Sequence, residues 1–135
     1  MTAQAWRWLS EALLLAVHEV QLAEHGGLPG LRDIGLLQSA LARAPNRAAY
    51  GAADAAALAA SYAYGIARNH PFNDGNKRMA LLAAEIFLLD NGQELIAPDA
   101  DIYKAIIDLA DGAVDEPAFA AWLRRNIRAA GWAAP

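Results

Sequence analysis

The stretch GNKRMALLAAEIFLLD, residues 75–90, decides the fold of this chain. After Lys77 and Arg78 it is apolar on every side except at Glu85, and a helix that is apolar all round belongs in the interior of a protein. The Asn-Gly pair at 91–92 then ends the helical pattern. We therefore predict that this stretch forms a buried central helix whose polar first turn lies at the surface.

Apolar residues recur at helical spacing on both sides of this segment. Helix starts are marked by side chains that accept hydrogen bonds from free N–H groups, and helix ends by glycine or by the residue before proline. The further helices expected on these signals run from Glu11 to Gly26, from Asp33 to Pro45, from about Asp54 to Asn69, from Asp99 to Gly112, and from Asp115 through Ile127. Since no stretch alternates convincingly with period two, we predict a single all-α domain, residues 1–135, of about six helices around the buried one.

The composition limits the class of protein. Of the 135 residues, 56% are apolar and 19% are charged, and the formal net charge is -4. This balance argues against a broad basic face that holds nucleic acid, so we expect a protein or small-molecule partner. The absence of cysteine excludes disulfide scaffolds and thiol nucleophiles. The apolar run at residues 12–17 is much shorter than the roughly eighteen residues of a membrane span, so we expect a cytoplasmic protein that does not enter the membrane.

The segment HPFNDGNKR, residues 70–78, joins two of the expected helices and carries most of the candidate chemistry. A helix that opens with residues 75–78 presents free N–H groups and the positive end of its dipole to an anion. Gly75 lets an oxygen approach the backbone, and the two cations of this turn add fixed positive charge. We predict a phosphate cradle, and its candidate binding residues are Asn73, Gly75, Asn76, Lys77 and Arg78.

An acid and a base stand beside this cradle. Asp74 is suited to hold a magnesium ion that bridges phosphate oxygens, since one protein ligand suffices when phosphates supply the others. Imidazole exchanges protons near neutral pH, so we assign His70 as the general base that takes the proton of an attacking hydroxyl. Phe72 is expected to point into the core and pin the loop, and Asn76 to orient the loop or to donate to a phosphate.

Each of these residues taken singly has an ordinary structural explanation. A lone histidine is usually structural, and Asp or Asn before a helix is a common cap. Capping explains Asn73 or Asp74, but it does not explain a base, a glycine, an amide and two cations at the mouth of one apolar helix. We therefore interpret residues 70–78 as an active site that transfers part of a nucleotide to a hydroxyl of another molecule.

The segment HPFNDGNKR resembles the signature of the Fic/Doc superfamily, and specifically of its Doc, or death-on-curing, toxins. The Doc form is His, any residue, Phe, any residue, Asp or Asn, Ala or Gly, then Asn-Lys-Arg, and every position here fits. The resemblance extends through GGLPG at 26–30 and the stop at 91–92, and it covers the chain from about residue 13 to 126. It implies an all-helical Fic-type domain in which the residue matching His70 activates the target hydroxyl and the one matching Asp74 serves magnesium.

The resemblance also implies a reaction. Doc toxins transfer phosphate from a nucleoside triphosphate, expected here to be ATP, to a threonine of elongation factor Tu, which stops translation. The common Fic form transfers AMP and reads GNGR, with a second arginine three residues after the first. Here Lys77 replaces the second glycine of that form and Leu81 stands where its second arginine would be. Phosphate transfer is therefore the leading hypothesis and AMP transfer the alternative; a non-catalytic binding module with the same fold is a third possibility.

An inhibitory partner is implied in the same way. Fic proteins often carry their own inhibitory motif, in which Glu follows Ser or Thr by four residues, and no Ser or Thr of this chain has such a Glu. The resemblance therefore implies a separate antitoxin of the Phd type, which makes the chain the toxin of a type II toxin–antitoxin pair.

Two features outside the motif are less decisive. The resemblance places a target-docking flap at residues 43–51, where Arg47 and Tyr50 stand. His18 and His25 lie seven residues apart on the first expected helix, and with no second type of ligand nearby we expect no metal ion there.

Overall fold

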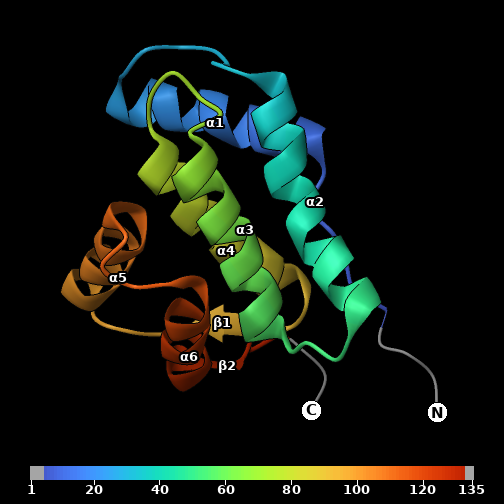
Figure 1. The fold of residues 1–135 in the computed structure, drawn as a ribbon. Coiled ribbons are helices and arrows are strands. Elements are labelled where there is room, and N and C mark those ends of the chain that lie inside the picture. The colour runs from blue at the N-terminus through green and yellow to red at the C-terminus, as the bar shows by residue number, and fades with distance from the viewer. Residues whose placement is uncertain (1–4, 133–135) are drawn as a thin grey trace.

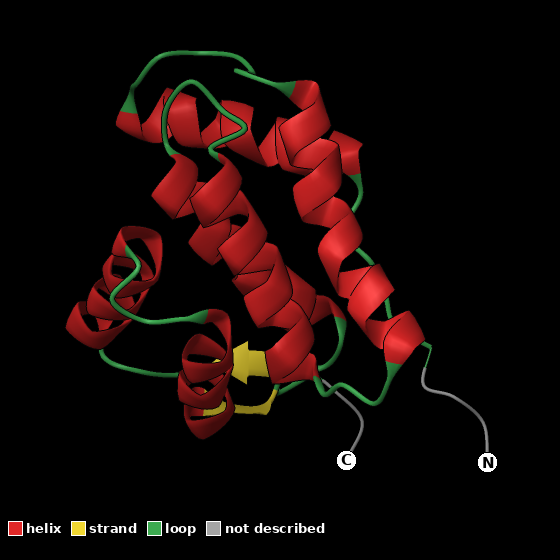
Figure 2. Cartoon of the chain, viewed as in Figure 1, coloured by secondary structure: helices red, strands yellow, loops and turns green. Residues whose placement is uncertain are grey.

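The computed structural model describes residues 5–132. Within this range the chain forms six α-helices and one two-stranded sheet (Figures 1 and 2). The elements are α1 (Glu11–His25), α2 (Ile34–Tyr50), α3 (Ala55–Asn69), α4 (Asn76–Asp90), β1 (Gln93–Leu95), α5 (Asp99–Asp111), α6 (Glu116–Asn126) and β2 (Ile127–Ala129). The prediction of an all-α fold is confirmed. None of the described helices is long and apolar enough to cross a membrane.

Most helices begin where a side chain can accept a backbone N–H. Four of them have such a cap, and each accepting side chain lies three residues before its donor: Ser10, Asp33, Asp54 and Asp115. Asp99 was expected to cap α5, but Pro98 occupies that position and Asp99 is the first helical residue. The fixed φ of the proline prepares the helical entry, and the carboxylate one residue later still faces the positive end of the helix dipole.

Helix α2 does not end before Pro45, as predicted, but continues to Tyr50. A proline inside a helix removes one backbone hydrogen bond, and here tertiary contacts outweigh that loss. Ala44, just before the proline, is completely buried, and Arg47, two residues after it, lies 3.5 Å from the carboxylate of Glu116 on α6. Residues 43–50 are therefore helical, and the expected flap is absent from this place.

Helices α3 and α4 form the centre of the molecule, and α3 is the more enclosed of the two. Eleven of its fifteen residues are buried, whereas six of the fifteen in α4 are. The prediction that residues 75–90 alone form the central helix was therefore incomplete. The small side chains of α3 let its neighbours approach closely: a Cβ atom at Gly65 would lie only 3.0 Å from the Ala40 Cα of α2. In Figure 1, α3 runs between α2 and α6 and packs on α4.

The last predicted helix ends earlier than expected. Ile127 belongs to strand β2, which pairs antiparallel with β1 in the register Leu95 to Ile127 and Gln93 to Ala129. Each strand has three residues, too few for an alternating pattern to stand out in the sequence. The pairing brings the end of the chain back to the segment that follows α4.

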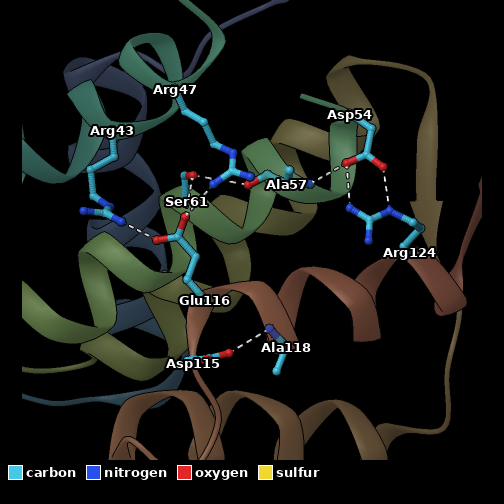
Figure 3. Close-up of polar contacts among 9 residues, drawn as sticks. All are labelled: Arg43, Arg47, Asp54, Ala57, Ser61, Asp115, Glu116, Ala118 and Arg124. Atoms are coloured by element: carbon cyan, nitrogen blue, oxygen red, sulfur yellow. Dashed lines mark hydrogen bonds and ion pairs between the residues drawn. The ribbon is translucent and has the colours of Figure 1, made fainter. Parts of the chain in front are cut away.

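Polar contacts fasten α6 to α2 and α3 (Figure 3). The Glu116 carboxylate, 14% exposed, accepts hydrogen bonds from Arg43 of α2 and, at 3.0 Å, from Ser61 Oγ of α3. At the other end of α6, Arg124 donates twice to Asp54, the residue that caps α3. This bond is the main reason that the pKa of the Asp54 carboxyl lies below its ordinary value.

Candidate active site

The loop of residues 70–75 joins the C-terminal end of α3 to the N-terminal end of α4. His70 ends α3 in the left-handed conformation, with φ 50° and ψ 57°, and its N–H donates to the Ile66 carbonyl. Gly75, left-handed at φ 78°, stands immediately before the first residue of α4. The chain therefore reverses over a few residues, and the segment 70–78 lies at one end of the central helix pair (Figure 1).

A cleft of about 630 Å³ opens at this end of the molecule. Its lining includes all seven residues selected from the sequence: His70, Asn73, Asp74, Gly75, Asn76, Lys77 and Arg78. Helix α5 contributes Tyr103, Ile106 and Ile107 to the same lining, and α4 adds Leu81. Phe72, in contrast, is 1% exposed and points into the core, as predicted. The cleft therefore combines the polar motif with an apolar side that belongs to a different helix.

The first turn of α4 is left open towards a ligand. In four other helices a side chain caps this turn, but within residues 5–132 no side chain accepts a capping hydrogen bond from α4. Neither Lys77 nor Arg78 forms an ion pair with another residue of the described chain. Free N–H groups, the positive end of a helix dipole and two cations together make an anion site.

Glycine is favoured at position 75 by its backbone conformation and not by a lack of space for a side chain. A methyl group added at this position would meet His18 Nε2 at 3.9 Å, which is an ordinary van der Waals contact. The left-handed φ of Gly75 is what favours glycine here. The alanine that the Doc form also allows at this position therefore fits sterically, although it carries the backbone strain.

The Asp74 carboxylate faces the cleft and the loop before α2. Its Oδ2 accepts the Leu28 N–H at 3.1 Å, and its Oδ1 accepts the Gly75 N–H at 2.9 Å. A Cβ atom at Gly27 would lie 2.8 Å from Oδ2, so this close approach requires glycine. Each carboxylate oxygen keeps acceptor capacity, which suits contact with a hard cation. The described residues contain no cluster of three metal-ligating side chains.

The segment at residues 28–33 holds the motif loop from outside. Leu31 pairs with Phe72 in an isolated antiparallel bridge. Asn73 donates from its side chain to the Pro29 carbonyl at 2.8 Å. Arg32 donates to two carbonyls at the end of α3, from Nε to His70 and from Nη2 to Asn69, each at 2.7 Å. The motif loop therefore packs against residues 28–33, a stretch that includes the last part of the GGLPG segment singled out in the sequence.

Asn76 orients the loop, which was one of its two predicted roles. Its Oδ1 accepts the Phe72 N–H at 3.0 Å and its Nδ2 donates to the Phe72 carbonyl at 2.9 Å. Both ends of the amide are thus engaged by the backbone of one residue. The second Nδ2 hydrogen and the Asn76 main-chain N–H are the groups that this residue can offer to a phosphate.

Three residues beside the motif were not selected from the sequence as parts of a site. Arg32 and His18 contact the motif loop, and Tyr103 lines the cleft from α5. Arg32 follows the GGLPG segment closely, so the extended resemblance was the one available signal for it. His18 and Tyr103 stand in ordinary helical patterns, and only the fold brings them to the site.

These observations agree with the comparisons to known proteins. The model of the Fic/DOC family matches residues 8–88, more than half of the chain, and the protein belongs to this family. The matched range includes the complete segment 70–78, all of α3 and all but the last two residues of α4.

Two curated relatives are similar over large parts of the chain. Protein kinase doc of Escherichia phage P1 is 34% identical over 120 residues, which cover 88% of this chain and 94% of the relative. Toxin Doc of Mycolicibacterium smegmatis (strain ATCC 700084 / mc(2)155) is 45% identical over 83 residues, which cover 59% of this chain and 62% of the relative.

Proposed function

We propose that this protein is a toxin that transfers the γ-phosphate of a nucleoside triphosphate, expected to be ATP, to a hydroxyl of another protein. The observation that carries the proposal is the cleft in which the open first turn of α4, with Lys77 and Arg78, lies beside Asp74 and His70. The relative from phage P1 that matches 88% of the chain is named a protein kinase, which supports the same reaction.

Each residue of the cleft has a separate role in the proposed phosphate transfer. His70 takes the proton of the target hydroxyl, and the oxygen attacks the γ-phosphorus. The bond from that phosphorus to the oxygen shared with the β-phosphate breaks, and the electron pair leaves with the nucleoside diphosphate. Lys77, Arg78 and the N–H groups of the first turn stabilise the charge on the phosphates. A magnesium ion bound by Asp74 would neutralise further phosphate charge.

The apolar side of the cleft suits the nucleoside. Tyr103 is 69% exposed and lines the cleft together with Ile106 and Ile107 of α5. An exposed aromatic ring beside a phosphate site is suited to stack on a base, whatever the base is. We infer that the triphosphate lies across the cleft, with its phosphates on α4 and its base on α5.

Two residues argue for phosphate transfer over AMP transfer. Leu81 lies in the cleft, at the place where the AMP-transferring form has its second arginine, and it supplies no charge there. Lys77 lines the cleft where that form has glycine, and its long cation changes which phosphate the cradle accepts. Gly75 is common to both forms, so AMP transfer remains the alternative outcome of the test.

The likeness to Doc toxins also supports proposals for the target and for the inhibitor. We propose that the modified hydroxyl belongs to a threonine of elongation factor Tu in the cytoplasm, so that translation stops. We also propose that a Phd-type antitoxin inhibits the protein, as the second half of a type II pair. The toxin name of the mycobacterial relative and the lack of an inhibitory Ser/Thr motif in this sequence support this arrangement.

The test uses the position of a radioactive label. The purified protein and magnesium are incubated with a bacterial lysate and ATP labelled at either the α or the γ phosphate, with His70→Ala as the inactive variant and His25→Ala as a matched control on α1. A band that carries only γ label, is lost in His70→Ala and runs at the size of elongation factor Tu supports the proposal. Label from α alone would make the protein an AMP transferase, and no His70-dependent label with any nucleotide would favour a binding module.

A further inference from the structure

His18 is a buried histidine that the proposed reaction does not use. It lies in the middle of α1 and is 3% exposed. Its ring stacks on Phe72, with 4.1 Å between the ring centroids and 21° between the planes. Its Nε2 lies 3.0 Å from the carbonyl oxygen of Asp74. A carbonyl oxygen only accepts hydrogen bonds, so Nε2 carries the hydrogen and donates it.

This bond acts on the peptide that leads into the phosphate cradle. A trans peptide is planar, and its C=O and N–H groups point in opposite directions. Because His18 holds the Asp74 carbonyl on the α1 side, the Gly75 N–H is directed to the other side, where it meets Asp74 Oδ1. The same peptide precedes the left-handed turn at Gly75, from which the free N–H groups of α4 follow.

We propose that His18 is a positioning residue for the transferase, one that fixes the Asp74–Gly75 peptide so that the carboxylate and the first turn of α4 face the phosphates. The inference rests on the proposed function. The ring fills space against Phe72, as any aromatic ring would, but the donated hydrogen bond requires a side chain that ends in N–H at this distance.

Two variants separate the two contacts of the ring. His18→Phe keeps a ring of similar shape against Phe72 but leaves the Asp74 carbonyl without its donor. His18→Gln keeps an N–H donor and loses the ring. If positioning depends on the hydrogen bond, the first variant is impaired and the second is largely spared, whereas a role in packing alone predicts the reverse. His25→Ala, on the same helix, is the control.

The first measurement is binding of magnesium and ATP to these variants in a His70→Ala background, by calorimetry, so that turnover does not intervene. We expect about tenfold weaker binding for His18→Phe, the effect of losing one hydrogen bond to a rigid site, and a change below about threefold for His18→Gln. Thermal unfolding shows that each variant is folded. If His18→Phe does not fold, the test rests on the affinity of folded His18→Gln for magnesium and ATP. A tenfold weaker affinity in that variant overturns the proposal.

The second measurement needs no nucleotide. Backbone NMR of the free protein reports the amide signals of residues 75–78, which should move in His18→Phe and stay close to wild type in His18→Gln. Unchanged binding and unchanged signals in His18→Phe would overturn the proposal. A wild-type protein that binds no ATP would contradict the proposed function instead, and the amide signals would still decide whether His18 holds this peptide.

Discussion

Replacing Arg32 with alanine should slow the proposed transfer much more than it weakens the fold. The Arg32 side chain donates to the carbonyls of Asn69 and His70, each at 2.7 Å. These carbonyls lie at the negative end of the α3 dipole, where a cation is stabilising. His70 is also the one non-glycine residue with a positive φ in the described chain, a conformation that costs about 1–2 kcal/mol and must be held by its surroundings.

The size of each effect follows from these contacts. Hydrogen bonds to a charged group contribute about 1.5–3 kcal/mol each when buried, but Arg32 is exposed and water replaces part of the loss. We therefore expect the free energy of unfolding to fall by about 1 kcal/mol, or a few degrees in melting temperature. A general base accelerates a reaction by about 10²–10⁴, and a shift of about 1 Å loses a large part of this. We expect kcat to fall by about 10- to 100-fold, with KM for ATP changed by less than about threefold.

The assay measures transfer of γ-phosphate at several ATP concentrations, with thermal unfolding in parallel. Arg128→Ala is the matched control, because it removes one exposed arginine from β2, away from the cleft. Arg32→Lys keeps the charge but not the planar fork, and it should be intermediate. An Arg32→Ala protein with normal kcat, or one whose activity falls only in proportion to its unfolding, would refute the idea that this arginine positions the base.

Three further predictions concern other parts of the molecule. Burial raises the pKa of Glu85 above its ordinary value of 4.5, so its charged form destabilises the fold as pH rises beyond that value; Glu85→Gln should raise the free energy of unfolding at pH 7 by roughly 0.5 kcal/mol, and denaturation at pH 4 should show this gain nearly gone. Tyr103→Ala should raise KM for ATP by about tenfold through lost stacking, whereas Tyr50→Ala, 92% exposed and outside the cleft lining, should leave it unchanged; equal values for both would contradict a base site on α5. Glu116→Ala removes the acceptor shared by α2 and α3 and should cost about 2 kcal/mol in chemical denaturation, an expectation that a loss below about 0.5 kcal/mol would contradict.

Several helix boundaries and the main cleft residues could be predicted from the sequence, because they depend on local chemistry. The caps Asp33 and Asp115 and the stop at Gly112 predicted helix boundaries correctly, because these signals act within one turn of the residue that carries them. The segment 70–78 identified the cleft residues for a similar reason. Its members are neighbours in sequence, so a single loop and the helix after it suffice to bring them together.

Other features were decided by contacts between distant segments. Helix α2 passes through Pro45 because α3 and α6 hold its second half. The local preference of proline predicts a helix end and gives no information about these distant contacts. Strand β2 exists because it pairs with β1, more than thirty residues earlier, and neither strand is long enough to have a pattern of its own.

The same division holds at the site. The sequence by itself determined the motif, its likeness to Doc toxins and the helix ends that frame it. Only the tertiary structure placed Arg32 and His18 against the motif loop and Tyr103 across the cleft. Those contacts join residues that lie 38 and 56 positions apart in the two hydrogen-bonded cases, and a pattern that is periodic over a few turns carries no information at that range.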